Sequence, residues 1–402
     1  MNKANITFSR KTIYSWYCYL LIGIAFLSSG HVYSITKGNL CSYILIVVLS
    51  LLLLKKITGK ATRLNYKSII ILVFIFVSFF IDMIMNILFD YNLFYSLRFF
   101  AVLIFSYVFT TEMSFDIFKD IYVKCMTVIS AIALIGFGIG SLSGFYYNLP
   151  TITNVNGVSY YDAVIFFGMD DYSRGRNIGI FWEPGIFAIF ISIAVLFLIF
   201  DKEKLNKLQL VVLMLTLFTT LSTTGYFLIS LCLIAFVYMR KKRGVTKAIL
   251  IILATVFAIF AIINISAVFN FLLSVFPRVF TKLIDNSASK THRIDSIKYN
   301  LEIFLQSPLW GSGLIRTNLL FSEMTKGSQT STMTLYFAQF GLIGIIYVAS
   351  HFIAVIKYRY WTKTMSILFC IAWAFLLNVE IVTFFPIIYI ISFYFIEENL
   401  LK

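Results

Sequence analysis

Two polar stretches of this otherwise apolar chain carry the residues best suited to chemistry, and the first combines basic residues with an acid. Arg174 and Arg176 shortly precede Glu183 in the run Arg-Gly-Arg-Asn-Ile-Gly-Ile-Phe-Trp-Glu-Pro-Gly. Glu183 is expected to lie about one helical turn inside the sixth apolar span, where an acid needs a partner, and these arginines are the nearest. Pro184 is expected to kink the following helix and open a polar pocket. An Arg–Glu pair that only anchors a helix end is the alternative, but an anchor does not require Trp, Pro and Gly around the acid.

The second stretch places a histidine and an arginine at the start of a predicted helix, which Thr291 caps and Pro308 ends. The guanidinium of Arg293 can bind a phosphate through two hydrogen bonds, and a helix N-terminus adds a favourable dipole. His292 can act as an acid or a base near neutral pH, unless it is a solvated surface residue. Arg316 is a further candidate, with contact to lipid headgroups as the alternative.

This predicted helix has two unlike faces. Arg293, Ser296 and Asn300 share one face, because they are spaced at i, i+3 and i+7. The apolar face consists of Ile294, Ile297, Leu301, Phe304 and Leu305. We expect an amphipathic helix that lies on the helical bundle or at the membrane surface.

Ionisable residues inside apolar runs form a third group. Asp82 and Arg98 occupy comparable depths in neighbouring runs, so they are expected either to pair structurally or to serve function. Glu380, at the outer start of the last run, is expected to line the same vestibule as the other candidates.

Composition explains what must position these residues. Of 402 residues 60% are hydrophobic, and the mean hydropathy is +0.90. Lipid cannot hydrogen-bond the backbone, so each long apolar run must be a helix. The predicted fold class is all-α, a polytopic membrane helical bundle of about 12 transmembrane helices in one integral membrane domain, residues 1–402. The expected spans are 13–29, 40–54, 68–89, 93–110, 121–141, 178–200, 208–222, 224–239, 246–264, 331–356, 364–378 and 381–397.

Orientation follows from the short connectors, because basic connectors remain in the cytoplasm. The strongly basic connectors all fall on one side of the predicted spans; they are 55–67, 202–207, 240–247 and 357–363. Both termini are therefore expected to be cytoplasmic in a multi-pass protein. Two larger loops remain outside, 142–177 and 265–330. The first, rich in Tyr, Asn and Gly, is expected to have irregular backbone.

Several classes of protein are excluded by what the sequence lacks. The net charge of +15 comes from membrane connectors and is no nucleic-acid footprint. The five cysteines have no CxxC spacing and no nearby His, so neither a metal site nor a disulfide framework is expected. Gly-rich phosphate loops, HExxH and GxSxG motifs are missing. We therefore expect no cofactor and no metal, and a reaction that uses an already activated donor.

Three pieces of sequence resemble a known family. They are the run from Arg174 to Ala188, the residues Arg293-Ile-Asp with Ser307-Pro-Leu-Trp-Gly-Ser-Gly, and Gln329-Thr-Ser-Thr-Met-Thr-Leu-Tyr-Phe-Ala-Gln-Phe-Gly-Leu-Ile-Gly. In order, spacing and outward placement they resemble the O-antigen polymerase/ligase superfamily, in particular Wzy-type polymerases of O-antigen or capsule repeat units.

The resemblance implies an enzyme of the bacterial cytoplasmic (inner) membrane that transfers glycans from undecaprenyl diphosphate at the outer face. It suggests that Arg176 and Arg293 bind the diphosphate. The substrate-binding candidates are then Arg174, Arg176, Arg293, Arg316 and Arg98, and the catalytic candidates are Glu183 and His292. Expected partners are the undecaprenyl-diphosphate-linked glycan, the lipid bilayer, a chain-length regulator and a flippase, with no nucleic acid.

The resemblance also separates polymerase from ligase. The ligases usually carry a His near the start of the span after the large loop, where this chain has Gln329-Thr-Ser-Thr. A polymerase is therefore favoured over a ligase. A flippase for lipid-linked sugars would have a similar number of spans, but no internal repeat is visible and the charges gather in outer loops. A scaffold without activity is the third alternative, and it would tolerate alanine at the arginines and Glu183.

Overall fold

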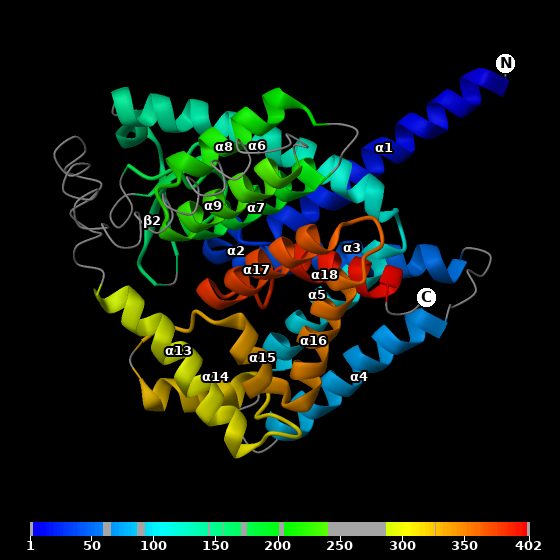
Figure 1. Cartoon of the computed structure of the whole chain (residues 1–402), viewed down its shortest axis with the longest axis vertical. Coiled ribbons are helices and arrows are strands. Elements are labelled where there is room, and N and C mark those ends of the chain that lie inside the picture. Colours follow the sequence, from blue (N-terminus) through cyan, green and yellow to red (C-terminus); the bar gives the residue numbers. More distant parts are fainter. Residues whose placement is uncertain are drawn as a thin grey trace.

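The computed structural model describes residues 3–58, 66–86, 93–143, 145–154, 156–169, 175–200, 205–239, 287–325 and 327–399. Helices dominate this part of the chain (Figure 1). The helices are α1 Lys3–Leu27, α2 Val32–Thr36, α3 Gly38–Thr58, α4 Tyr66–Asn86, α5 Leu93–Thr110, α6 Phe115–Ser143, α7 Pro184–Phe200, α8 Lys207–Thr219, α9 Thr223–Met239, α13 Ser287–Gln306, α14 Leu314–Met324, α15 Thr332–Phe340, α16 Leu342–Ile356, α17 Lys363–Val379 and α18 Pro386–Asn399.

The predicted helical bundle is confirmed in its main features. Three of the described helices are long and apolar enough to cross a membrane, and seven shorter apolar helices accompany them. The predicted span 93–110 coincides with α5. The predicted span 246–264 lies outside the described residues, so the number of twelve spans stays a prediction.

Helix α7 is enclosed on all sides, since every residue from Pro184 to Phe200 is buried. A helix that is apolar around its whole circumference belongs inside a bundle. Pro184 is its first residue, where the fixed φ of proline suits a helix and no N–H is needed. The expected kink at Pro184 is therefore wrong. Glu183 lies just before the helix and not one turn inside it.

The predicted span 331–356 is interrupted, because α15 and α16 meet at Gly341. Gly341 has a φ of 57°, which residues with a side chain rarely adopt. The backbone of Gly311 passes so close that a Cβ on Gly341 would lie 2.6 Å from the Gly311 nitrogen. Gly313 donates its N–H to the Gln339 carbonyl at 2.9 Å. The sequence piece that contains Gly311 and Gly313 and the piece that contains Gln339 and Gly341 thus pack against each other through their backbones.

The segment predicted as the first outer loop contains a small sheet, which an all-α prediction did not include. Strands β1 (Thr151–Thr153), β2 (Ser159–Asp162) and β3 (Phe167–Met169) are antiparallel in the order β1-β2-β3, and the 3-10 helix η1 (Phe145–Asn148) precedes them. Tyr160 and Phe167 pack with Val32 of α2 in a cluster separate from the main core. Period-2 alternation was too short here to be recognised.

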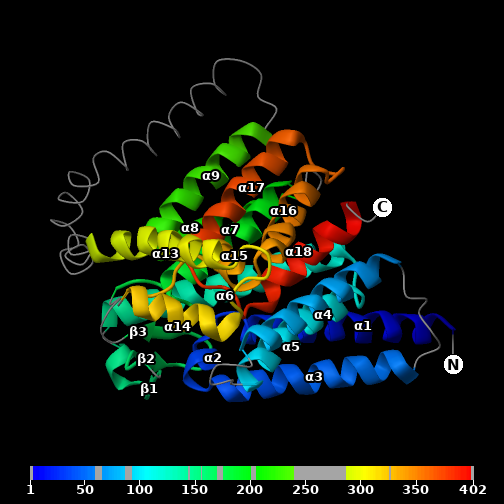
Figure 2. The same cartoon turned by 90° about the horizontal axis from the view of Figure 1, so that it is seen from below.

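The segments that connect the helices contact one another in two groups, one at each end of the bundle. At the first, which we call the sheet end, Trp182 donates its N–H to the Gly30 carbonyl at 3.0 Å, and its ring lies 5.3 Å from that of Phe385. At the second, the basic end, the rings of Phe200 and Trp361 are 4.9 Å apart. Figure 2 shows the sheet and α13 on the side away from both termini. The predicted outer and inner connectors are thus gathered separately.

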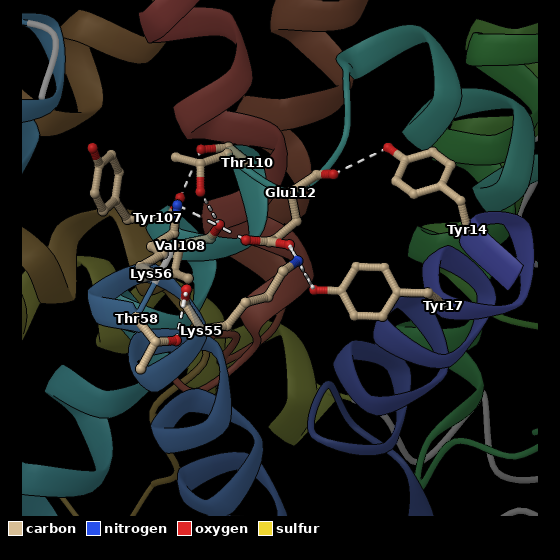
Figure 3. A network of polar contacts seen from close by, with 10 residues as sticks. Tyr14, Tyr17, Lys55, Lys56, Thr58, Tyr107, Val108, Thr110 and Glu112 are labelled. Atoms are coloured by element: carbon tan, nitrogen blue, oxygen red, sulfur yellow. Dashed lines mark hydrogen bonds and ion pairs between the residues drawn. The ribbon is translucent and has the colours of Figure 1, made fainter. Parts of the chain in front are cut away.

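An ionic network closes the basic end (Figure 3). Glu112 follows α5 and its side chain is only 7% exposed; Lys55 pairs with it, and Lys56 is 3.8 Å away. Tyr17 donates its hydroxyl to the carboxylate at 2.6 Å, and Tyr14 donates to the Glu112 carbonyl at 3.1 Å. Burial alone would raise the pKa of Glu112, but hydrogen bonds from Lys55 and Tyr17 and the lysine charges lower it. The ionised carboxylate ties α1, α3 and the α5–α6 turn together.

Candidate functional site

The segment before α7 is held in place from two sides. Asn177 donates its backbone N–H to the Thr219 carbonyl and its side-chain amide to the Thr219 hydroxyl, both at 3.0 Å. On the other side, the Gly179 carbonyl accepts the N–H of Phe167 from β3 at 2.8 Å. Because the segment is fixed between the α8–α9 turn and the sheet, the side chains that it carries have defined positions.

Arg176 is the first charged residue of this segment. Its Nε donates to the Thr220 carbonyl at 3.2 Å, and its side chain is half-buried. Burial lowers the pKa of Arg176, while the charges of Glu183 and Glu380 raise it. The guanidinium is therefore within electrostatic range of two carboxyl groups, one of them the Glu183 that the sequence suggested as its partner.

Glu183 and Glu380 form the centre of the site, joined by a side-chain hydrogen bond. Glu380 is the C-cap of α17, from a chain segment far from Glu183 in sequence. Burial, followed by the charge of Glu183, raises the pKa of Glu380 well above its usual value. Two carboxylates this close cannot both ionise readily, so one proton is shared. The hydrogen bond between the two acids raises the pKa of Glu380 and lowers that of Glu183, which favours the proton on Glu380.

Gly185 makes room for this pair. A Cβ at position 185 would collide with Oε1 of Glu380. The second residue of α7 must therefore be glycine if the carboxyl group of Glu380 is to reach Glu183. The Trp-Glu-Pro-Gly run thus has a steric explanation for its glycine and a helix-start explanation for its proline.

Glu183 has much protein around its carboxyl group, and its side chain is nevertheless accessible to solvent. Burial is the first cause of its raised pKa, although its own surface remains accessible, whereas Arg176 and Glu380 are half-buried. Both observations hold for a carboxyl group that has protein around it on most sides and keeps part of its surface in solvent. Solvent can therefore reach Glu183.

Arg293 completes the cluster from the second outer loop. Its charge acts on both Glu183 and Glu380 and lowers the pKa of each. It lies on α13, which begins at Ser287 and not after Thr291 as expected. Guanidinium groups from the two predicted outer loops thus act on one carboxyl pair, although Arg293 is more than a hundred residues from Arg176.

The polar face of α13 docks Arg293 against the bundle. Ser296 accepts the N–H of Thr330 at 3.0 Å and that of Ser331 at 3.1 Å, and Asn300 donates to Gln329 Oε1 at 3.0 Å. Both Ser296 and Asn300 are fully buried. The α13 face predicted from the i, i+3, i+7 spacing is therefore the one that contacts the protein.

The apolar face of α13 points the other way. Ile294 is 57% exposed, Leu301 39% and Leu305 71%. This arrangement is the reverse of a helix on a water-soluble protein and is typical of a helix whose apolar face meets lipid.

The start of α15 links α13 to Glu380. Thr332 donates its hydroxyl to the Glu380 carbonyl at 2.7 Å and accepts the N–H of Val382 at 2.9 Å. Ser331 donates to Asn378 Oδ1 at 2.7 Å. The third quoted sequence piece therefore positions the site without supplying one of its charged groups.

Arg98 and Arg316 lie apart from the carboxyl pair, whose acting charges are Arg176 and Arg293. Arg98 of α5 places its guanidinium over the ring of Phe384, 4.9 Å from the centroid. Arg316 is half-buried in the first turn of α14, and the first residue of α14, Leu314, donates its N–H to Asp82 at 2.6 Å. Asp82 and Arg98, considered as a pair from the sequence, thus each have a contact of their own, and both of their charges reach Tyr95.

Two further candidates lie outside the described residues. They are Arg174 and the side chain of His292. Their expected roles remain predictions.

Sequence reasoning missed Tyr226, whose hydroxyl lies near enough to Arg176 to act on its charge. Tyr226 belongs to the first turn of α9. The available signal was the polar run Thr219-Thr-Leu-Ser-Thr-Thr-Gly-Tyr between two apolar stretches. The polarity of this run indicates a connector between two helices. It does not indicate that the connector contacts the segment before α7.

A family model for O-antigen ligases matches residues 208–349. The predicted resemblance to the O-antigen polymerase/ligase superfamily is confirmed over this part, about a third of the chain. The match runs from α8 to α16 and includes Arg293, but not Arg176, Glu183 or Glu380. It fits an O-antigen polymerase or ligase, that is, a glycosyl-transfer enzyme, and gives a flippase no support. No curated protein and no solved structure matches the chain.

Proposed function

We propose that this chain polymerises polyprenyl-diphosphate-linked oligosaccharide repeat units into a surface polysaccharide, O-antigen or capsule, at the outer face of the cytoplasmic membrane. The observation that carries the proposal is that the charges of Arg176 and Arg293 both act on the acids Glu183 and Glu380, whose side chains come together at the start of α7. With one proton shared by the acids, the four side chains carry a net positive charge beside an ionised carboxylate. Glycosyl transfer from a diphosphate needs positive charge to stabilise the anionic leaving group and a base to accept the proton of the attacking hydroxyl. These four side chains can supply both.

The reaction follows from these groups. The hydroxyl oxygen of the acceptor sugar attacks the anomeric carbon of the donor glycan and forms the new glycosidic bond. The bond from that carbon to the diphosphate oxygen breaks, and the diphosphate leaves with the electron pair. Glu183 takes the proton of the attacking hydroxyl. Arg176 and Arg293 stabilise the charge that develops on the departing diphosphate.

Glu380 keeps Glu183 ready as a base. Because the proton of the pair resides on Glu380, Glu183 is ionised and accepts a hydrogen bond in the resting enzyme. The raised pKa of Glu183 brings its basicity closer to that needed near neutral pH. Glu380 is therefore a positioning residue, and Glu183 is the group that meets the substrate.

A ligase is the second candidate, because the matching family is described as one of O-antigen ligases. The sequence feature against it is the absence of His from Gln329-Thr-Ser-Thr. In the structure, Gln329 and Ser331 are already engaged with Asn300. These bonds support a positioning role for the polar residues that stand there.

Analysis of glycolipids from a deletion strain separates these functions. Loss of a polymerase leaves single repeat units on the final acceptor, whereas loss of a ligase leaves long chains on the polyprenyl carrier. Loss of a flippase leaves repeat units on the cytoplasmic side. Complementation by the wild-type gene but not by Arg176→Gln would support the proposed site, and long chains in the deletion strain would refute polymerisation.

The membrane orientation is part of the same proposal. Both termini and the basic end would face the cytoplasm, and the sheet end would face outward as part of a single membrane domain. Labelling of a cysteine introduced at Tyr147, which is 64% exposed beside the sheet, tests this in intact cells. A membrane-impermeant maleimide should label Tyr147→Cys but not Lys55→Cys. A chain-length regulator and a flippase remain expected partners, which co-purification can test.

A further inference from the structure

A second polar pocket lies at the sheet end, away from the carboxyl pair. It is lined by Ser28, Ser34, Cys41, Ser42, Arg98 and Phe384, with aliphatic residues of α3 and α5 below them. Arg98 is its one lining residue with a full charge. The pocket thus combines a guanidinium with several hydroxyl groups and a thiol.

The polar groups of this pocket are incompletely matched. Within the described part of the chain, no carboxylate pairs with Arg98 and no group accepts a hydrogen bond from it; its contact is with the Phe384 ring. The buried hydroxyl of Ser28 also lacks a partner there. A half-buried guanidinium without a counter-charge is costly, and an anionic ligand that accepts hydrogen bonds from both groups would remove the cost.

The surroundings suit an anion that is attached to a lipid. Tyr43 and Val47 of α3 are 53% and 56% exposed, and Phe94 and Leu97 of α5 are 38% and 45% exposed. The rings of Tyr43 and Phe94 lie 6.0 Å apart. These side chains flank the pocket on the helices that carry Cys41 and Arg98, so a hydrocarbon tail can remain in the bilayer while its headgroup enters.

A short connector joins this pocket to the candidate site. Phe384 contacts Arg98, and the next residue, Phe385, packs its ring 5.3 Å from that of Trp182. Trp182 directly precedes Glu183, and Glu380 begins the same connector to α18. The pocket and the carboxyl pair therefore lie on two sides of residues 380–385.

We propose that the Arg98 pocket is a second lipid-phosphate site, which holds the phosphate of one polyprenyl-linked glycan while Arg176 and Arg293 hold the diphosphate of the other. The inference rests on the proposed function, because a polymerase that joins two lipid-linked glycans must hold two such headgroups at once. The guanidinium and hydroxyl groups recognise the phosphate, and the exposed faces of α3 and α5 accommodate the tail.

Lipid stoichiometry tests the proposal directly. The full-length protein is placed in phosphatidylcholine nanodiscs and titrated with polyprenyl diphosphate, and bound lipids are counted by native mass spectrometry. The wild type should bind two, and Arg98→Gln should bind one. Arg98→Lys, which keeps the charge, should recover part of the second binding event. Two lipids on Arg98→Gln, or one on the wild type, would overturn the proposal.

A matched control and two competitors define the site. Arg359 also lies over an aromatic ring, that of Tyr360 at 4.7 Å, but at the basic end, so Arg359→Gln should still bind two lipids. Displacement of the second lipid by inorganic pyrophosphate or phosphatidylglycerol at equal concentration would show a general anion or phospholipid site and would overturn the assignment. The number of bound lipids is measured without any turnover. It can therefore confirm or overturn the second lipid site even if the cell experiments show that the protein is not a polymerase.

Discussion

Two glutamate clusters at opposite ends of this bundle combine acidic and basic side chains and have opposite electrostatics. At the basic end, Glu112 meets two lysines and a tyrosine hydroxyl, and its pKa is lowered. At the sheet end, Glu183 meets a second carboxyl group, and burial raises the pKa of both acids even though Arg176 and Arg293 are near. The basic-end cluster balances the charge of its acid, whereas the sheet-end cluster holds two acids whose pKa values are both raised.

The difference distinguishes a structural ion pair from a reactive site. A carboxylate whose hydrogen bonds and charge are all matched stabilises the fold and has little capacity to take up a proton. A pair of acids that shares one proton is stabilised by neighbouring arginines only in part, and it can exchange that proton with a substrate. Exposure agrees with this distinction, because Glu183 is exposed and the Glu112 side chain is only 7% exposed.

Reversing the charge of Arg293 should have the largest effect on this contrast. Arg293→Glu brings a third acid to the carboxyl pair, repels the diphosphate and should reduce polymer formation by about 100-fold or more. Polymer length and amount are measured by gel electrophoresis of cell-surface glycans, with membrane levels of the protein checked in parallel.

Lys298→Glu is the matched control on the same helix. Lys298 is 61% exposed and lies 3.9 Å from Glu302, so its reversal should change polymer formation by less than about 3-fold. Equal losses in the two variants would show that α13 responds to charge in general, and normal polymer in Arg293→Glu would remove Arg293 from the site.

Neutralising the two acids separately should give unequal losses. Glu183→Gln removes the base and should lower the transfer rate about 100-fold. Glu380→Gln retains a hydrogen-bond donor for Glu183 and should lower it only about 10-fold. Initial rates with purified enzyme and lipid-linked repeat units measure both.

The pH profile sharpens the same test. Wild-type activity should fall at low pH as Glu183 gains a proton, and at high pH as Glu380 loses the one that it holds. Glu380→Gln should abolish the fall at high pH and keep the fall at low pH. An unchanged profile would contradict the proton-sharing pair, whatever the size of the rate loss.

Removing the charge at the basic end should affect stability rather than chemistry. Glu112→Gln leaves Lys55 and Lys56 without their acid and should cost about 1–2 kcal/mol of unfolding free energy. The specific transfer rate of the folded protein should stay within about 2-fold of wild type. Thermal unfolding in nanodiscs and initial rates test this, and a large rate loss at full stability would mean that the two ends are coupled.

The smallest expected effect concerns how folding stability depends on pH. Glu112 at the basic end and Glu380 at the sheet end should contribute pH dependences of opposite sign. The lowered pKa of Glu112 contributes stability above the unfolded value of about 4.3, and this is lost as pH falls through the folded value. The raised pKa of Glu380 acts oppositely, since its contribution to stability is lost as pH rises above the unfolded value toward the raised folded value. Glu380→Gln should therefore raise the melting temperature at pH 8 and not at pH 4.

Local sequence determined the helices and one face of the site. Long apolar runs must be helical in lipid, which predicted most described helices to within a few residues. The i, i+3, i+7 spacing of Arg293, Ser296 and Asn300 predicted the docking face of α13, because side-chain direction in a helix follows from its period. The nearness of Arg176 to Glu183 also followed from a short separation along the chain.

Tertiary structure decided where three of the predicted spans are interrupted or shortened, and which distant groups come together. Hydropathy extended two spans across residues that the structure leaves outside helices, those before Pro184 and before Pro386, and it bridged the break at Gly341. Apolar character is a property of each residue, whereas a break at Gly341 depends on the backbone of Gly311 packing against it. Likewise, Glu380 faces Glu183 only because α17 ends beside the start of α7, and no spacing within one segment contains that contact.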